Sequence, residues 1–268
     1  MSDFLQTMAA LSTERAAAAG RLSAASFDKP AIPLDLSEFD VIAEIKDRSP
    51  AEGKLAKSDS DRAARAQSYA AGGAAAISVL TEPSQFAGSL EHLEEVVAAV
   101  PGTPVMRKDF LVDPIQILEA RGAGASGVLL ITTMLADDEL RKMLDCAAEH
   151  DMFVLLESFD ADDLARANRL LDNVENQERA ERGQLLVGVN TRNLRTLHVD
   201  PDRLRDLAPA LPAARCVAES GLRDADDAAA VAALGYRLAL VGTALMRSDD
   251  PAALVAAMQS AGSRRVSA

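Results

Sequence analysis

Two lysines end apolar runs of the chain, where a charged side chain is costly unless it finds a partner. Lys46 ends the run 41–46 and Lys108 ends the run 104–108. Only 6 of the 28 basic residues are lysines, so arginine is the usual surface cation of this chain. Because lysine, unlike arginine, can shift its pKa and transfer a proton, both positions are candidates for acid–base chemistry.

Two glutamates accompany these lysines. Glu44 precedes Lys46 by two residues, so both side chains point to one face of a strand. Glu157 ends the apolar run 152–157, where it can act as a general base or a charge partner. If Lys108 points toward Lys46, burial and repulsion are expected to lower the pKa of one amine into the range of a general acid. The alternatives are a structural ion pair for Glu44 with Lys46 and a helix-start acid for Glu157.

Polar residues also follow the later apolar runs. Asn190 and Arg192 alternate onto one side, where they can orient a hydroxyl or amide and bind a carboxylate or phosphate. The stretch 219–221 follows the next run, and 242–243 lies at the end of the last one. Both stretches contain glycine, as do many phosphate-binding loops. Together they favour a phosphorylated substrate.

Short apolar runs alternate with helical patterns from residue 41 onward. The runs predict eight strands, at 41–46, 75–80, 104–108, 127–131, 152–157, 185–190, 215–218 and 238–242. Their near-continuous apolar character predicts parallel strands that are covered on both faces. Eight units of about 27 residues fit a closed (β/α)₈ barrel. The alternative, an open doubly wound sheet, lacks its Gly-rich dinucleotide motif after the first run.

We expect one α/β domain over residues 1–268, with the barrel at 41–260. The carboxyl ends of barrel strands form the active site, and the polar residues above lie at those ends. Residues 1–40 contain an Ala-rich helical pattern at 4–22 and a proline-containing loop, which are expected to cap one barrel end. The polar stretch 172–184 lengthens the fifth connection beyond the usual roughly 2–6 residues. A solvated excursion is expected there, or else an oligomer or partner contact.

Composition excludes several classes of protein. The chain is 49% hydrophobic and 26% charged, which is typical of a soluble globular domain. A net charge of −13 disfavours binding to nucleic acid or to anionic membranes. No run reaches the roughly 20 apolar residues of a membrane span, and residues 1–20 do not resemble a secretion signal. We therefore expect a cytoplasmic protein.

Other catalytic classes lack their residues. The three histidines end none of the expected strands, so neither Ser-His-Asp catalysis nor a His-based metal site is indicated. The two cysteines cannot form a disulfide framework or a four-ligand zinc site. Acid–base chemistry by lysine and glutamate, with no metal and no cofactor, is what the sequence favours.

Several motifs, in order along the chain, resemble the indole-3-glycerol-phosphate synthase family. They are IAEIKDRSPAEG (42–53), SVLTEPSQFAGS (78–89), RKDFLVDPIQILEARGAGA (107–125), LLES (155–158), VGVNTRNLRTLHVD (187–200), AESGL (218–222) and VGTALMR (241–247). The resemblance implies a (β/α)₈ barrel with an N-terminal extension. It also implies a step of tryptophan biosynthesis without metal or cofactor. In that step 1-(2-carboxyphenylamino)-1-deoxyribulose 5-phosphate becomes indole-3-glycerol phosphate with loss of CO₂ and water.

The resemblance also implies roles for the charged residues. Lys108 resembles the general acid that protonates the ketone oxygen of the substrate during ring closure. Glu157 resembles the general base of the later dehydration. Lys46, with Glu44 as its partner, resembles the lysine that meets the anthranilate carboxylate.

The remaining matched residues complete the expected site. Asn190, Arg192 and Ser220 match polar positions of the family's active site, so the resemblance implies that they belong to the catalytic residues. Expected substrate-binding residues are Ser49, Gly221, Gly242 and Thr243 at the phosphate, Phe110 and Leu129 at the aromatic ring, and Glu219 beside Ser220. The expected partner is therefore a small phosphorylated molecule. The protein itself is expected to be a monomer or weak homo-oligomer, with possible contacts to other enzymes of the tryptophan pathway.

The sequence departs from the family pattern at three places. Ala51 stands where the family often has a second serine, Ser158 and Phe159 follow Glu157 where it often has Val-His, and the stretch 172–184 is longer. Two alternative hypotheses are an isomerase of the same barrel type and a non-catalytic phosphate-binding paralogue. An isomerase does not need Lys46, Lys108 and Glu157 together, and a binding protein has no need to bury several titratable groups.

Overall fold

Eight parallel strands form a closed barrel in the computed structural model, which describes residues 4–20, 27, 29–49, 53–55, 62–194 and 198–266. The strands are β1 (Asp40–Ile45), β4 (Ala76–Leu80), β5 (Val105–Lys108), β6 (Gly127–Ile131), β7 (Phe153–Ser158), β8 (Leu185–Asn190), β9 (Cys216–Glu219) and β10 (Leu238–Val241). Each strand pairs with the next, and β10 pairs with β1 in parallel register. The prediction of a (β/α)₈ barrel is confirmed.

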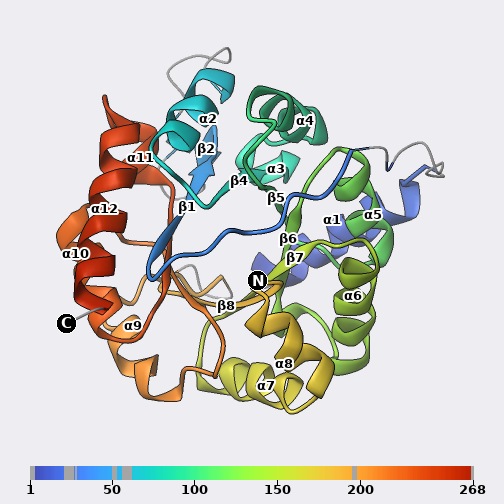
Figure 1. Ribbon diagram of the computed structural model, residues 1–268. Coiled ribbons are helices and arrows are strands. Elements are labelled where there is room, and N and C mark those ends of the chain that lie inside the picture. The colour runs from blue at the N-terminus through green and yellow to red at the C-terminus, as the bar shows by residue number, and fades with distance from the viewer. Residues whose placement is uncertain are drawn as a thin grey trace.

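Helices surround the barrel (Figure 1) and connect its strands. They are α2 (Arg62–Ala71), α3 (Pro83–Phe86), α4 (Leu90–Ala99), α5 (Pro114–Gly122), α6 (Asp137–Glu149), α7 (Ala161–Leu171), α8 (Val174–Glu181), α9 (Arg203–Leu207), α10 (Ala225–Ala233), α11 (Thr243–Arg247) and α12 (Pro251–Val266), with 3₁₀ turns η2 (Thr132–Met134) and η3 (Ala208–Ala210). A short hairpin of β2 (Arg48–Ser49) and β3 (Gly53–Lys54) follows β1. None of the helices in the described ranges is both long and apolar enough to cross a membrane.

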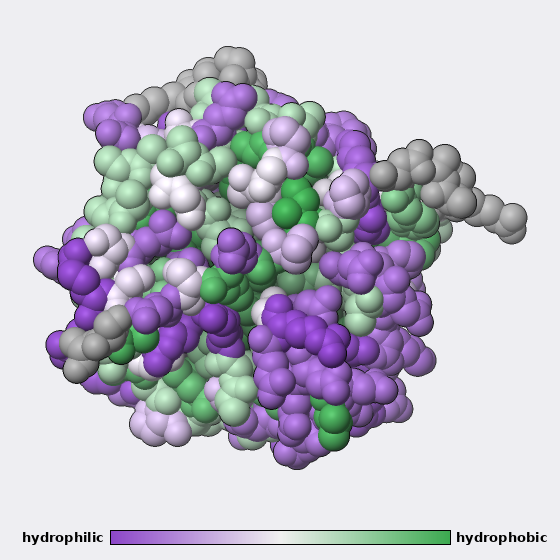
Figure 2. Space-filling model, in the orientation of Figure 1, coloured by the Kyte–Doolittle hydropathy of each residue, from purple (hydrophilic) through white to green (hydrophobic). Residues whose placement is uncertain are grey.

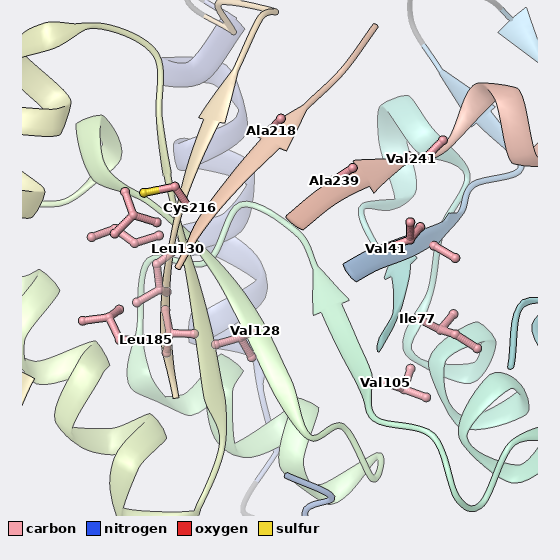
Figure 3. Packing of buried hydrophobic residues seen from close by; sticks show 14 of the residues in the cluster. Val41, Ile77, Val105, Val128, Leu130, Leu185, Cys216, Ala218, Ala239 and Val241 are labelled. Carbon is pink, nitrogen blue, oxygen red and sulfur yellow. The ribbon is translucent and has the colours of Figure 1, made fainter. Parts of the chain in front are cut away.

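Alternation along the strands divides the core into two layers. Val41, Ile77 and Val105 belong to the layer between strands and helices, and Figure 3 shows them on neighbouring strands. Ile42 and Leu186 belong to the layer inside the barrel. Because both faces are buried, the strands read as continuous apolar runs. A polar residue inside the barrel is therefore easy to recognise in the sequence.

The N-terminal extension contacts both ends of the barrel. Helix α1 (Phe4–Ala18) reaches the carboxyl end, where Arg15 pairs with Asp109. The segment 31–39 runs across the barrel to the start of β1, shown in blue in Figure 1. Along this path, the Ile32 amide donates to Ser126 Oγ just before β6. The sequence led us to expect a cap on one end, but in the described residues the helix and the loop lie at opposite ends.

The polar stretch 172–184 forms helix α8. Asn173 caps its start, and the Asn176 side chain donates to the Leu170 carbonyl at the end of α7. Arg179 pairs with Asp145 of α6 at 3.2 Å, and Ala180 is buried. Hydrophilic residues dominate the face of the molecule over α6 and α8 (Figure 2). The stretch is therefore an extra helix packed on the barrel through a few small and polar contacts.

Candidate active site

A cavity of about 700 Å³ opens at the carboxyl ends of the strands. Every site residue predicted from the sequence lines it except Glu219: Glu44, Lys46, Ser49, Lys108, Phe110, Leu129, Glu157, Asn190, Arg192, Ser220, Gly221, Gly242 and Thr243. Glu219 is fully buried below the cavity, where it accepts a hydrogen bond from Lys108. Polar strand ends far apart in the sequence thus meet in one place, as barrel geometry requires.

Glu44 lies between the two lysines at the base of the cavity. Its Oε1 is 3.0 Å from Lys46 Nζ, and its Oε2 is 3.1 Å from Lys108 Nζ. Burial alone would raise the pKa of Glu44, but the two ammonium groups outweigh burial and lower it to about 2. Glu44 is therefore a fixed negative charge, and the predicted pairing of Glu44 with Lys46 includes Lys108 as well.

Lys108 is surrounded by carboxyl groups. Besides Glu44, its Nζ lies 3.2 Å from Glu219 Oε2. Burial would lower the pKa of Lys108, but the charges of Glu44, Glu219 and Glu157 outweigh it and raise the pKa above that of a free lysine. The expectation of a lowered amine pKa is wrong for Lys108, because Glu44 separates the two lysines and replaces repulsion with attraction.

The environment of Glu157 raises the pKa of its carboxyl group, whereas the environment of Glu44 lowers the pKa of that carboxyl. Its side chain is buried at the end of β7, where Asn190 Nδ2 donates to its Oε2 at 3.1 Å. Burial and the neighbouring Glu219 carboxyl raise the pKa of Glu157 well above the usual value, and Lys108 opposes this only in part. A raised pKa makes a glutamate a stronger base and brings it closer to neutral pH. Helix α7 begins only at Ala161, capped by Asp160, so Glu157 is not a helix-start acid.

Two left-handed residues shape the loop after β9. Ser220 has φ of 66° and Gly221 has φ of 82°, and both line the cavity. A serine at positive φ is uncommon and is typical of functional sites. On the neighbouring strand, Asn190 Oδ1 accepts from the Arg192 amide at 2.9 Å, which fixes the turn that carries Arg192.

Gly242 leaves space for the charged cluster. A Cβ at this position would overlap Glu44 Oε1 and lie 3.0 Å from Lys46 Nζ. The missing side chain at Gly242 therefore leaves the space that the Glu44–Lys46 pair occupies. Gly242 also lines the cavity, together with Thr243 and Ser49. Ala51, named above as a departure from the family pattern, lies outside the described residues.

An aromatic wall closes one side of the cavity. Phe110 contacts Phe4 of α1 at 5.9 Å between ring centroids and Phe86 of α3 at 6.2 Å. Sequence reasoning missed Phe4 and Phe86, because neither follows a long strand. For Phe86 a signal was present: Glu82 and Pro83 together predict a helix start just after β4, and the Glu82 carboxylate does cap α3. No local pattern places Phe4.

Asp109 anchors the loop that follows Lys108. Its carboxylate accepts from Arg15 Nη2 at 2.7 Å, from Thr81 Oγ1 at 2.7 Å and from the Phe110 amide at 2.8 Å. Arg107 Nη2 adds a contact at 3.2 Å. Helix α1, β4 and the Lys108 strand are thereby tied together beside the cavity.

Comparison with solved structures supports the fold alone. A 3-hexulose-6-phosphate synthase from Salmonella typhimurium aligns with a TM-score of 0.62 at 17% identity, over 85% of this chain and 100% of that one. A thiamine phosphate pyrophosphorylase from Pyrococcus furiosus aligns with a TM-score of 0.56 at 13% identity, over 85% of this chain and 98% of the other.

Comparison at the sequence level identifies the family. A family model described as indole-3-glycerol phosphate synthase matches residues 15–258. A protein of that name from Nocardioides sp. is 46% identical over 89% of this chain and 88% of its own length. Another, from Rhodococcus jostii, is 44% identical over 83% of this chain and 78% of its own. These matches confirm the resemblance seen in the motifs: the chain belongs to the indole-3-glycerol phosphate synthase family.

Proposed function

We propose that this protein converts 1-(2-carboxyphenylamino)-1-deoxyribulose 5-phosphate to indole-3-glycerol phosphate, CO₂ and water, a step of tryptophan biosynthesis. The observation that carries the proposal is the position of Lys108. Its ammonium group lies between Glu44 and Glu219 at the base of a cavity that Glu157 also lines. Family membership supports the same reaction.

In the first step Lys108 donates its proton to the ketone oxygen. The ring carbon that carries the carboxylate bonds to the ketone carbon, and the oxygen becomes a hydroxyl group. The carboxylates around Lys108 keep it charged in the free enzyme. It still donates, because the alkoxide that forms during ring closure is far more basic than an amine. Loss of CO₂ then restores the aromatic ring.

In the last step the new hydroxyl takes a second proton, which is supplied from solvent, and leaves as water, while Glu157 accepts the proton lost from the neighbouring carbon. Its raised pKa suits this role. Asn190 holds the Glu157 carboxyl by a hydrogen bond of 3.1 Å. The substrate receives two protons and gives one back to the enzyme. One net proton therefore enters from solvent, and it balances the negative charge of the substrate carboxylate that leaves as neutral CO₂.

The cavity has room for the whole substrate, since its volume of about 700 Å³ lies within the range of ligand pockets. We assign the phosphate to Ser49, Gly221, Gly242 and Thr243, and the aromatic ring to the apolar side with Phe110 and Leu129. Lys46 then faces the anthranilate carboxylate, and Arg192 and Ser220 contact the polar chain between the two ends. Glu219 acts beneath the substrate by holding Lys108.

The test is a fluorescence assay of the purified protein with the substrate in the presence of EDTA. Appearance of the indole product supports both the reaction and its independence of a metal. A folded protein that binds the substrate without forming product contradicts the proposal and favours a diverged phosphate-binding paralogue.

We further propose a cytoplasmic enzyme that is a monomer or weak homo-oligomer. Both Cys146 and Cys216 are free thiols, as is usual in a reducing compartment. Light scattering after size-exclusion chromatography tests the oligomeric state, and the same measurement in mixtures tests contacts with other enzymes of the pathway. A stable tetramer, for example, contradicts the proposal.

A further inference from the structure

Gly188 lies between two glutamates of neighbouring strands. It pairs in register with Glu157 of β7, and on its other side Asn190 pairs with Glu219 of β9. The Glu219 side chain reaches over β8 at this point. Its Oε1 occupies the space that a Cβ on Gly188 would need. The absence of a side chain at 188 thus opens a passage across β8 between the two carboxyl groups.

In each of the two carboxyl groups, one oxygen already accepts a hydrogen bond. Glu157 Oε2 accepts from Asn190, and Glu219 Oε2 accepts from Lys108. The other oxygens, Glu157 Oε1 and Glu219 Oε1, are buried and receive no hydrogen bond from any other described group. Two ionised carboxylates in contact repel each other, whereas one proton placed between them satisfies both oxygens.

We propose that Gly188 is a positioning residue: its missing side chain lets Glu157 and Glu219 share a proton across β8, which opens a path from Glu157 to Lys108. The inference rests on the proposed function. Lys108 loses a proton during ring closure, and Glu157 gains one during dehydration. Glu219 is hydrogen-bonded to Lys108 and lies beside Glu157, so it passes the shared proton to Lys108 after ring closure. Glu157 is then free to accept the proton lost during dehydration, which restores the shared proton for the next turnover.

Among the charged groups that face Glu157, Glu219 is the one that raises its pKa. Lys108 faces it from β5, and behind Lys108 lie Glu44 and Lys46 of β1, which are paired with each other. The neighbouring strand β6 adds apolar residues to this part of the cavity. Burial and Glu219 raise the pKa of Glu157, so displacement of the Glu219 carboxyl must lower it.

The test compares Gly188→Ala with Val189→Ala. The added methyl group at 188 meets the end of a flexible side chain, so the fold is expected to survive while the Glu219 carboxyl moves away. Val189 lies on the same strand but belongs to the outer layer, so its truncation costs stability without changing the pair. Glu219→Gln, of nearly the same shape, removes the shared proton without the methyl group.

The primary readout is infrared titration of the protonated carboxyl group in the enzyme without substrate. Wild type is expected to keep this signal at higher pH than Gly188→Ala or Glu219→Gln, and Val189→Ala is expected to match wild type. Gly188→Ala is also expected to lower kcat about tenfold or more with little change in KM. If Gly188→Ala does not fold, the Glu219→Gln titration decides.

Unchanged titration in Glu219→Gln, or in a folded Gly188→Ala, overturns the inference. Because this titration needs no substrate, the two proposals fail separately. A shift in the titration without any product from wild type contradicts the proposed function alone. Product formation without a shift contradicts the shared proton alone.

Discussion

Lys108 Nζ lies 3.1 Å from Glu44 Oε2, although the two residues belong to β5 and β1, which are separated by β4. The contact therefore spans the width of β4 on the inner side of the barrel. It places one fixed negative charge beside the proton that the reaction is proposed to use. The stability and the chemistry of the site therefore depend on the same carboxylate.

Glu44 is expected to make part of the stability of the protein depend on pH. Its pKa is about 2 in the folded protein against 4.5 in an exposed chain, so its ionised form stabilises the fold above pH 4.5. This contribution, about 3 kcal/mol, is lost as the pH falls from 4.5 toward 2. We expect the difference in unfolding free energy between wild type and Glu44→Gln to shrink over that range in urea titrations.

The control for this prediction is Glu94→Gln, which changes an exposed carboxylate on α4. Its difference from wild type is expected to stay constant as the pH falls. A constant difference for Glu44→Gln as well would show that the two lysines do not stabilise the ionised form of Glu44.

Gly221→Asp is expected to raise KM about tenfold or more, because it places a negative charge where we assign the phosphate. Gly221 also has φ of 82°, so any side chain there brings strain. Gly221→Ala brings the strain without the charge and is expected to raise KM much less. Steady-state kinetics on both variants separate the two effects. Equal KM values would place the phosphate elsewhere.

Strand ends were predictable because a barrel buries both faces of every strand. A charged or amide side chain at the end of an apolar run, such as Glu157 or Asn190, therefore stands out in the sequence. Barrel topology then places these ends together without any knowledge of side-chain contacts. This explains why residues as far apart as Lys46 and Thr243 were assigned to one cavity.

Contacts across the barrel were not predictable. Sequence spacing shows that Glu44 and Lys46 share a face, but it does not show that Lys108 and Glu219, 111 residues apart, are hydrogen-bonded. The expected lowering of one amine pKa does not hold for Lys108, because the sequence does not show the carboxyl groups that surround it. Phe4 reaches the cavity because helix α1 docks on the barrel through contacts such as Arg15 with Asp109 and Ser12 with Gln116, and no local pattern encodes those contacts.

Arg15→Ala is expected to weaken the docking of α1 by about 1–2 kcal/mol, because Asp109 loses a hydrogen bond from a charged group. Phe4 then leaves the cavity wall more often, so KM rises and α1 is cleaved faster in limited proteolysis. Arg15→Lys retains a single ion pair and is expected to show smaller changes. If Arg15→Ala matches wild type in both measurements, the ion pair of Arg15 with Asp109 is not needed to dock α1 beside the cavity.

The central claim is that Lys108 supplies the proton for ring closure, and the kcat of Lys108→Arg tests it most directly. Arginine keeps the positive charge between Glu44 and Glu219 but does not give up its proton. The surface variant Lys142→Arg on α6 controls for the substitution itself. We predict a decrease in kcat of about 100-fold or more for Lys108→Arg and none for Lys142→Arg. A folded Lys108→Arg enzyme that turns over as fast as wild type would contradict the account.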